Sequence, residues 1–221
     1  MSYLTRIIAD TRSRPVRRDL GDCHALHRTL LGGFPQAPEG AQAREHFGLL
    51  YRAEPLAGAP SLVRVLLQSK ITPSWEHLPA GYLGPDLDGR GNPATRQLDG
   101  EYDQLAAGVR LFFRLRANPT KKLSDRTPGR ENTLLGKRVA LLREEEQLAW
   151  LARKGERHGF RMLETAAAPE LPDARAAVQE GVRGRRSGRG DVEAMPLRFG
   201  AVLFEGRLEV TDRELFLTAL R

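Results

Sequence analysis

The stretch from Val109 to Arg116 constrains the fold most, because apolar and basic side chains alternate along it without a break. The positions that share one side of an extended strand are all apolar: Val109, Leu111, Phe113 and Leu115. The positions on the other side are basic or aromatic: Arg110, Phe112, Arg114 and Arg116. A period of two is typical of a strand with one buried face. The chain therefore contains a sheet with one core face and one open face.

The open face of this strand has two interpretations. Basic residues beside an aromatic ring form a surface that can hold an RNA backbone and stack a base. An ordinary half-exposed strand with a helix packed over Phe112 would show the same pattern. The sequence alone leaves both interpretations open.

The segments before this strand follow a recognisable order. They are a strand at 2–9, a helix at 22–31, strands at 47–54 and 61–70, and a weak helix at 94–107. With 109–116 as the last strand, the order is β-α-β-β-α-β, the ferredoxin-like unit. Residues 10–21 and 71–97 are predicted as connections, the first rich in arginine and the second in proline and glycine.

A second unit is predicted after a polar segment. Residues 124–136 contain few hydrophobic residues and include Pro128 and Gly129, which indicates a linker. A strand from 136, a helix at 143–157 and strands at 160–165, 199–204 and 207–210 follow, with a last helix at 213–220. We therefore expect an α+β fold of two tandem ferredoxin-like (RRM-like) domains: 1–123 with the helix at 22–31, 124–135 as linker, and 136–221 with a basic hairpin.

The predicted helix at 22–31 carries His24, His27 and Arg28 on one side. Histidine can take and give a proton near neutral pH. Asp22 is a plausible N-cap, so both imidazoles would lie in the first turns, where backbone N–H groups favour an anion such as phosphate. Arginines crowd the approach: Arg12, Arg14, Arg17 and Arg18. This combination indicates chemistry on a nucleic-acid backbone.

The charge balance agrees with an RNA partner. Lys and Arg number 35 against 28 Asp and Glu, which gives a net charge of +7. Arginine suits phosphates and exposed bases, although a solvated surface in an arginine-rich coding background would give the same balance. The single cysteine, Cys23, excludes an internal disulfide and fits a reducing cytosol. No stretch is long enough to span a bilayer, so we expect a cytoplasmic protein with no membrane partner.

Two further patterns have alternative interpretations. His24-x-x-His27 could be half of a zinc site, but no nearby Cys, Asp or Glu completes it, so we expect no metal and no cofactor. Residues 178–190 combine arginine and glycine and are predicted as a hairpin with a basic tip. The tip could instead be a disordered loop that orders on RNA. The arginines concerned are Arg183, Arg185, Arg186 and Arg189.

Five motifs occur in order along nearly the whole chain, at 26–30, 113–121, 136–141, 159–161 and 202–210. Together they resemble the CasE family of CRISPR repeat-cleaving endoribonucleases, subunits of type I-E Cascade. The resemblance implies two ferredoxin-like domains and a basic cleft for the repeat stem-loop. It also implies metal-independent cleavage of pre-crRNA at the base of the stem. In this reaction a 2′-hydroxyl would attack the neighbouring phosphate and leave a 2′,3′-cyclic phosphate. The enzyme would then retain the product for Cascade.

The resemblance also assigns residues. The family's catalytic histidine corresponds to His27, and the family's tyrosine three positions earlier is His24 here, which could share proton transfer, orient the ribose or only contact RNA. The residues expected to bind RNA are Arg12, Arg14, Arg17, Arg28, Lys121, Lys122 and the four arginines of the basic tip. The family continues into a glycine-rich loop and a closing strand, whereas nothing follows Arg221, so we expect the second domain to lack its last strand and to bind RNA more weakly.

Two hypotheses compete with the endoribonuclease. One is a noncatalytic RNA-hairpin-binding subunit of a ribonucleoprotein. The other is a basic protein whose charge serves only assembly with other subunits.

Overall fold

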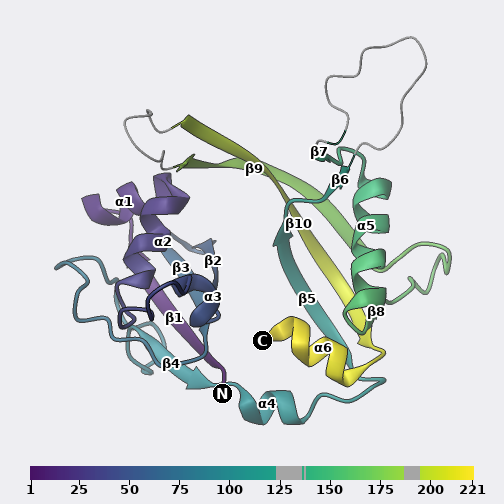
Figure 1. Ribbon diagram of the computed structural model, residues 1–221, viewed down its shortest axis with the longest axis horizontal. Helices are drawn as coiled ribbons and strands as arrows, with labels where there is room; N and C mark the ends of the chain where they lie inside the picture. Colours follow the sequence, from purple (N-terminus) through teal and green to yellow (C-terminus); the bar gives the residue numbers. More distant parts are fainter. Residues whose placement is uncertain (123–135, 137, 187–194) are drawn as a thin grey trace. The chain divides into compact units, whose positions relative to one another are not determined.

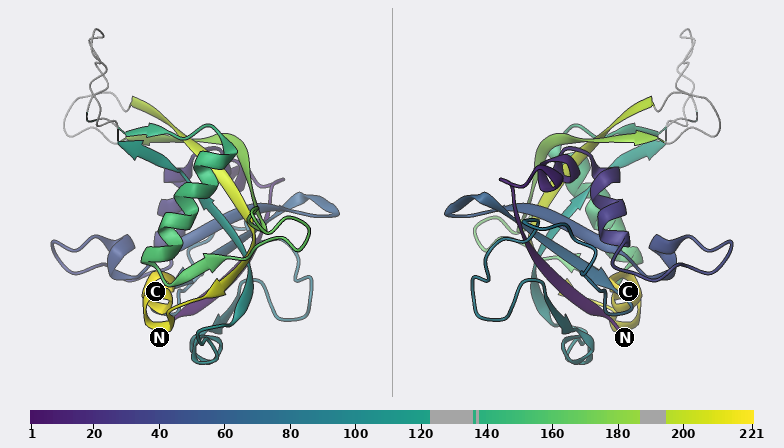
Figure 2. Two further views of the ribbon diagram at one scale, coloured as in Figure 1. Left: turned by 90° about the vertical axis from the view of Figure 1, so that its right-hand side faces the viewer. Right: turned by 90° about the vertical axis from the view of Figure 1, so that its left-hand side faces the viewer.

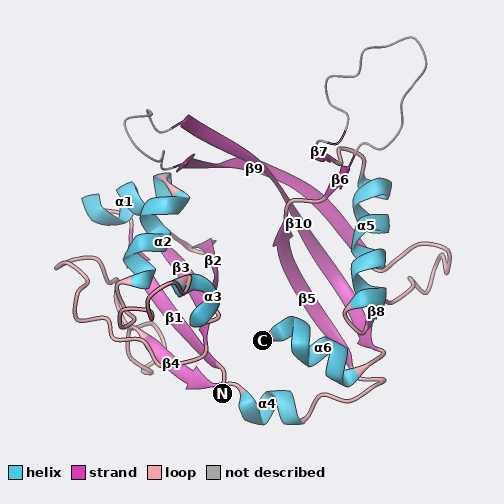
Figure 3. Ribbon diagram, in the orientation of Figure 1, coloured by secondary structure: helices cyan, strands magenta, loops and turns pink. Residues whose placement is uncertain are grey.

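The computed structural model describes residues 1–122, 136, 138–186 and 195–221. Within 179–200 it describes the backbone of these residues and not their side chains. The chain divides into two compact units, one built around residues 1–104 and the other around residues 105–182 and 199–220. Figure 1 labels the helices and strands of both units, and Figure 3 separates them by type. Each unit is an antiparallel sheet with helices packed on it, which confirms the predicted α+β class of two ferredoxin-like domains.

The first unit holds a four-stranded antiparallel sheet in the order β2-β3-β1-β4. The strands are β1 (Tyr3–Asp10), β2 (Leu50–Leu56), β3 (Ala59–Ser69) and β4 (Ala94–Gln97). The helices are α1 (Arg14–Gly21), α2 (Cys23–Leu31), α3 (Ala43–His46) and α4 (Asp99–Asp103). The core lies between α2 and the sheet, where Leu26 and Leu30 pack with Ile7, Val65 and Leu67. This packing holds one face of α2 and leaves its histidine side toward the surface.

The predicted weak helix at 94–107 is wrong over its first part. Residues 94–97 are β4 instead, paired with β1 from Tyr3↔Gln97 to Arg6↔Ala94. Pairing with an adjacent strand outweighs the weak local helix preference here. Only the five residues of α4 are helical, after the strand.

The connection at 10–21 contains a helix that was not predicted. α1 begins at Arg14 with Pro15 in its first turn, where a missing backbone N–H costs nothing. Val16 is fully buried against Ala9 and Tyr82. The Ser-x-Pro spacing at Ser13 and Pro15 was the available signal for this helix start.

The second unit is built on β5 (Arg110–Ala117), β10 (Met195–Val210) and β8 (Phe160–Met162), in that order across the sheet, with β9 (Ala174–Arg186) pairing β10. Its helices are α5 (Glu144–Arg157) and α6 (Arg213–Leu220). A small two-stranded sheet joins β6 (Thr120–Lys122) to β7 (Arg138–Ala140). Figure 2 shows α5 lying along the larger sheet, and Leu151 of α5 packs on Val202 and Phe204 of β10.

The alternating strand, β5, lies in this second sheet and not in the first domain to which it was assigned. It pairs with β10 from Val202↔Ala117 to Glu209↔Arg110. The two units meet in sequence between 104 and 105, so the predicted end of the first domain at 123 is too late. The alternation correctly predicted a strand, and Leu111 and Phe113 on its apolar side are half-buried against the core, but Leu115 on the same side is 39% exposed. The alternation carries no information about the sheet that the strand joins. The predicted linker at 124–135 lies outside the described residues.

No described helix is long and apolar enough to span a membrane.

Candidate functional site

The N-terminus of α2 is closed by the side chain of Asp22. The backbone of Asp22 is extended, with φ −140° and ψ 112°, and its Oδ1 accepts the backbone N–H of His24 at 2.8 Å. The predicted N-cap is therefore confirmed. The cap also changes one expectation, because a carboxylate already lies where the free N–H groups were expected to attract phosphate. A phosphate at this site would depend on cationic side chains.

His27 lies half-buried on α2, and its ring stacks on Tyr51 of β2. The ring centroids are 6.1 Å apart and the ring planes differ by 23°. Burial lowers the pKa of His27 below the ordinary value, and the positive charges of Arg44 and His24 lower it further. The imidazole is consequently neutral near pH 7, which is the form that accepts a proton.

Tyr51 joins β2 to the first turn of α2. Its hydroxyl donates to the backbone carbonyl oxygen of Cys23 at 3.1 Å. Burial raises the pKa of Tyr51, so the phenol keeps its proton at neutral pH. Tyr51 was predicted only as part of a strand, since no local motif connects it with His27.

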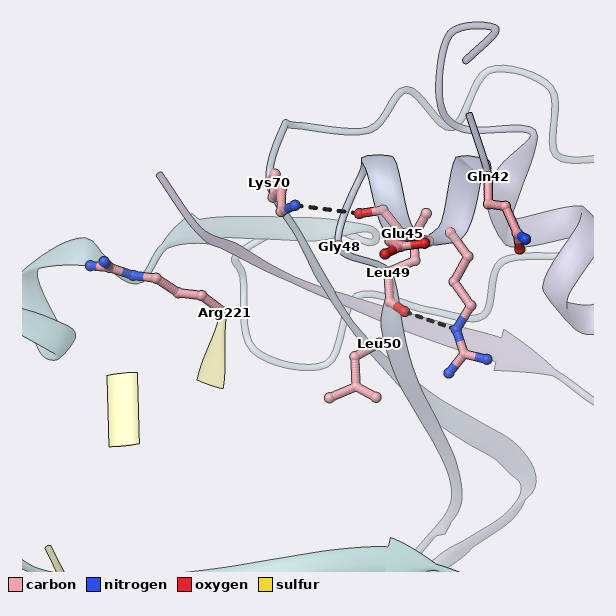
Figure 4. Close-up of a pocket in the computed structure, with 8 residues that line it drawn as sticks. Gln42, Glu45, Gly48, Leu49, Leu50, Lys70 and Arg221 are labelled. Carbon is pink, nitrogen blue, oxygen red and sulfur yellow. Dashed lines mark hydrogen bonds between the residues drawn. The ribbon is translucent and has the colours of Figure 1, made fainter. Parts of the chain in front are cut away.

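Arg44 of α3 is the second residue near His27 that the sequence did not point to. It is exposed, and its Nε donates to the carbonyl oxygen of Leu49 at 3.4 Å. Arg44 also lines a pocket, whose residues Figure 4 draws as sticks, and there Lys70 Nζ donates to the carbonyl oxygen of Glu45 at 3.3 Å. In both bonds the acceptor is a neutral backbone carbonyl, so neither bond neutralises the positive charge of Arg44 or Lys70.

Asp19 holds α1 against α2. Its carboxylate is fully buried. It accepts hydrogen bonds from Thr29 Oγ1 at 2.7 Å and from the Tyr82 hydroxyl at 3.0 Å. Arg18 completes the arrangement with an ion pair of 2.8 Å. The arginine-bearing helix is therefore fixed relative to the helix that carries His27.

The predicted RNA-binding arginines of the first unit differ in how they are engaged. Arg12 pairs with Asp10 at 2.6 Å, and Arg17 donates to two backbone carbonyls before α1, at 2.8 and 2.6 Å. Arg14 and Arg28 are exposed, and neither has a carboxylate within ion-pair distance among the described residues. Arg14 and Arg28 are thus the arginines of this group most available to a phosphate.

The predicted basic residues of the second unit are only partly described. Lys121 pairs with Glu146 of α5 at 2.8 Å, and Lys122 is exposed. β9 pairs with β10, as the hairpin interpretation expects, but it includes the positions of three of the four arginines that were predicted at the tip, so these positions belong to a strand. These three are Arg183, Arg185 and Arg186, whose side chains lie outside the described part of the chain, as does the whole of Arg189.

The open face of β5 is solvent-exposed. Phe112 is 86% exposed, so the alternative with a helix over it is wrong for the described residues. Arginines on this face pair with glutamates of β10: Arg110 with Glu209 at 3.3 Å, and Arg114 with Glu205 at 3.0 Å. The face therefore combines an exposed ring with partly neutralised guanidinium groups.

The described residues contain no group of three or more His, Cys, Asp or Glu side chains that could hold a metal ion. His24 and His27 share one side of α2, and among the described residues no third side chain joins them to form a metal site. Acid–base chemistry is what this pair of imidazoles can perform.

The chain matches the family model described as CRISPR associated protein over residues 2–221. It is 38% identical over 219 residues to the CRISPR-associated endoribonuclease Cse3 of Thermus thermophilus, covering 99% of this chain and 91% of the relative. It is 32% identical over 154 residues to the CRISPR system Cascade subunit CasE of Escherichia coli, covering 69% and 64% of the two chains.

A solved structure of Thermus thermophilus Cse3, bound to an RNA representing a pre-cleavage complex, has the same fold. The TM-score is 0.68 at 35% identity, and the match covers 100% of this chain and 90% of the other. The family model and the curated relatives each span most of the chain, and they agree with the resemblance carried by the sequence motifs. The chain therefore belongs to the CRISPR-associated protein family that includes the Cse3 and CasE proteins.

Proposed function

We propose that this chain is an endoribonuclease that binds the stem-loop of a CRISPR repeat and cleaves pre-crRNA at the base of the stem. The observation that carries the proposal is the placement of His27, half-buried beside Tyr51 with its pKa lowered. The Thermus thermophilus relative supports it, since it is named an endoribonuclease and has a solved structure bound to an RNA representing a pre-cleavage complex.

The reaction needs one proton removed and one returned. His27, neutral near pH 7, accepts the proton of the ribose 2′-hydroxyl as its oxygen attacks the adjacent phosphorus. The bond from phosphorus to the 5′-oxygen breaks, and that oxygen takes up a proton. The products are a 2′,3′-cyclic phosphate and a 5′-hydroxyl. Proton transfer by a positioned side chain supplies roughly 10²–10⁴-fold in rate, and no metal ion takes part.

We assign the returned proton to His24. It lies three residues before His27, so the two side chains share one side of the helix. The positive charge of protonated His24 lowers the pKa of His27. Arg14, Arg28 and Arg44 are exposed cations of the same unit that can neutralise charge on the phosphorane.

The same proposal includes the partners. The Escherichia coli relative is named a Cascade subunit, and we infer that this chain likewise keeps its cleaved RNA and assembles with other Cascade subunits. Lys122 and the arginines of the basic tip would add contacts to the RNA stem. We place the protein in the cytoplasm, since RNA processing and a single unpaired cysteine both suit that compartment.

The test is single-turnover cleavage of a repeat hairpin RNA. His27→Ala should abolish cleavage and leave the hairpin dissociation constant within about twofold, with a loss of roughly 10²–10⁴ in rate. His158→Ala, at the end of α5 in the other unit, is the matched control and should cleave normally. Cleavage by His27→Ala at the wild-type rate would contradict the assignment, and normal binding without any wild-type cleavage would favour the noncatalytic hairpin-binding subunit.

A second measurement tests the chemistry. EDTA should leave the rate unchanged, and the upstream fragment should carry a cyclic phosphate that acid treatment opens. Loss of activity in EDTA would refute the metal-independent mechanism.

A further inference from the structure

Tyr51 is the aromatic side chain that the structure stacks on His27, and nothing in the cleavage chemistry above uses it. Its ring lies 6.1 Å from the imidazole between centroids, nearly parallel to it at 23°. Its hydroxyl donates a hydrogen bond to the backbone carbonyl oxygen of Cys23, the first residue of α2. One side chain therefore contacts both the imidazole and the helix that carries it.

We propose that Tyr51 is the positioning residue of this site: its ring fixes the direction of the His27 imidazole, and its hydroxyl fixes the start of α2 against β2. The inference rests on the proposed function of His27 as the proton acceptor. Tyr51 is not itself a catalytic residue, because its role is exerted through His27 and not on the substrate.

The packing around Tyr51 explains how it can hold an imidazole in place. β2 pairs with β3 in register from Leu50↔Gln68 to Pro55↔Val63, so the backbone of Tyr51 is fixed by the sheet. The side chain packs against the core cluster of the first unit. A ring anchored at both ends has little freedom to move, and a stacked imidazole takes its orientation from it.

Three elements surround His27, and two of them carry a group that can be positively charged. His24 lies on its own helix, Arg44 lies on α3, and Tyr51 on β2 stays uncharged at neutral pH. Burial, to which the stacked Tyr51 ring contributes, opposes protonation of His27 most, and the positive charges of Arg44 and of protonated His24 add to this. Removing the ring should therefore both loosen the imidazole and let water reach it.

The experiment separates the ring from the hydroxyl. Tyr51→Phe keeps the ring and removes the bond to Cys23, whereas Tyr51→Leu and Tyr51→Met keep apolar volume and remove the ring. Tyr3→Phe and Tyr3→Leu are matched controls, since Tyr3 lies on β1 with its hydroxyl 3.6 Å from the Met1 sulfur. Each variant is studied by NMR titration of the His27 ring without RNA and by single-turnover cleavage from pH 5 to 8.

In Tyr51→Leu and Tyr51→Met the His27 titration should move to higher pH, and the cleavage profile should move with it. The plateau cleavage rate should fall by about tenfold to a hundredfold, since a small misplacement of a reacting group has that cost. The hairpin dissociation constant should change less than twofold. Tyr51→Phe should retain the wild-type titration and lose a smaller part of the rate than the ring-deleted variants, because it removes only the hydroxyl bond that fixes the start of α2. The Tyr3 variants should match the wild type.

The proposal is overturned if the His27 titration and the cleavage profile of the ring-deleted variants coincide with those of the wild type. It is also overturned if the Tyr3 variants shift the titration equally. The titration arm does not depend on cleavage. A protein in which His27→Ala still cleaves, while Tyr51→Leu shifts the His27 titration, would refute the catalytic assignment and retain the positioning contact.

Discussion

Asp19 should be the most consequential buried charge in the first unit, and Asp19→Ala tests this. The carboxylate is fully buried and accepts hydrogen bonds from Thr29 at 2.7 Å and from Tyr82 at 3.0 Å. Hydrogen bonds to a charged group contribute about 1.5–3 kcal/mol each. The Arg18 side chain is largely exposed, so its ion pair adds about 1 kcal/mol or less. We expect the free energy of unfolding to fall by roughly 3–5 kcal/mol, the range for breaking a buried charged network.

The assay is urea unfolding followed by tryptophan fluorescence in a Trp150→Phe background. The remaining tryptophan, Trp75, packs against the core of the first unit and reports on that unit. Asp88→Ala is the matched control, because its carboxylate pairs with Arg6 near the surface, where solvent screens an ion pair, and should cost much less stability than Asp19→Ala.

Asp19→Ala should also slow cleavage, since α1 and α2 are no longer tied together through Thr29. A loss of stability below about 1 kcal/mol, or one equal to that of Asp88→Ala, would refute the reasoning that this carboxylate holds the two helices together.

The remaining predictions concern the reaction and the RNA. An RNA with sulfur in place of the 5′-bridging oxygen has a leaving group that needs no proton, so it should restore cleavage by His24→Ala and not by His27→Ala; equal rescue of both would contradict the assigned roles. With that substrate the wild-type rate should rise with pH and then level off, with its midpoint at the lowered pKa of His27. A midpoint above the ordinary value of about 6.5 would contradict the burial of the ring. Because the pKa of His27 is lower in the folded state, its contribution to the free energy of unfolding should be complete above about pH 6.5 and should be lost on acidification. Urea unfolding at a series of pH values should show a weaker pH dependence in His27→Ala than in the wild type. Arg14→Ala should reduce the slope of log affinity for the hairpin against log salt by about 0.7–0.9, and an unchanged slope would exclude a phosphate contact there.

The parts of the fold that follow from local pattern were predictable. α2 with its Asp22 cap, α5, and the extended strand β5 each depend on residues within one or two turns or one strand. Capping and periodicity act at that range, so the sequence contains the information. The candidate histidines were found for the same reason, because they share one helix.

The parts that depend on distant pairing were not predictable in the same way. β4 forms because it pairs with β1, and β5 joins the second sheet because it pairs with β10, more than 80 residues further along the chain. Tyr51 and Arg44 approach His27 only after β2 and α3 pack beside α2. No spacing in the sequence joins these residues, so a single sequence could supply their local structure and not their role.

The Asp22 cap means that the helix bearing both imidazoles is already complete in the RNA-free enzyme. RNA binding therefore does not have to order the first turn of α2 and loses no conformational entropy there. The catalytic groups are preorganised, and association needs no folding step at this helix end. The same carboxylate repels small oxyanions at the helix end. Inorganic phosphate should therefore compete poorly, and the scissile linkage should approach the flank of the helix and not its axis.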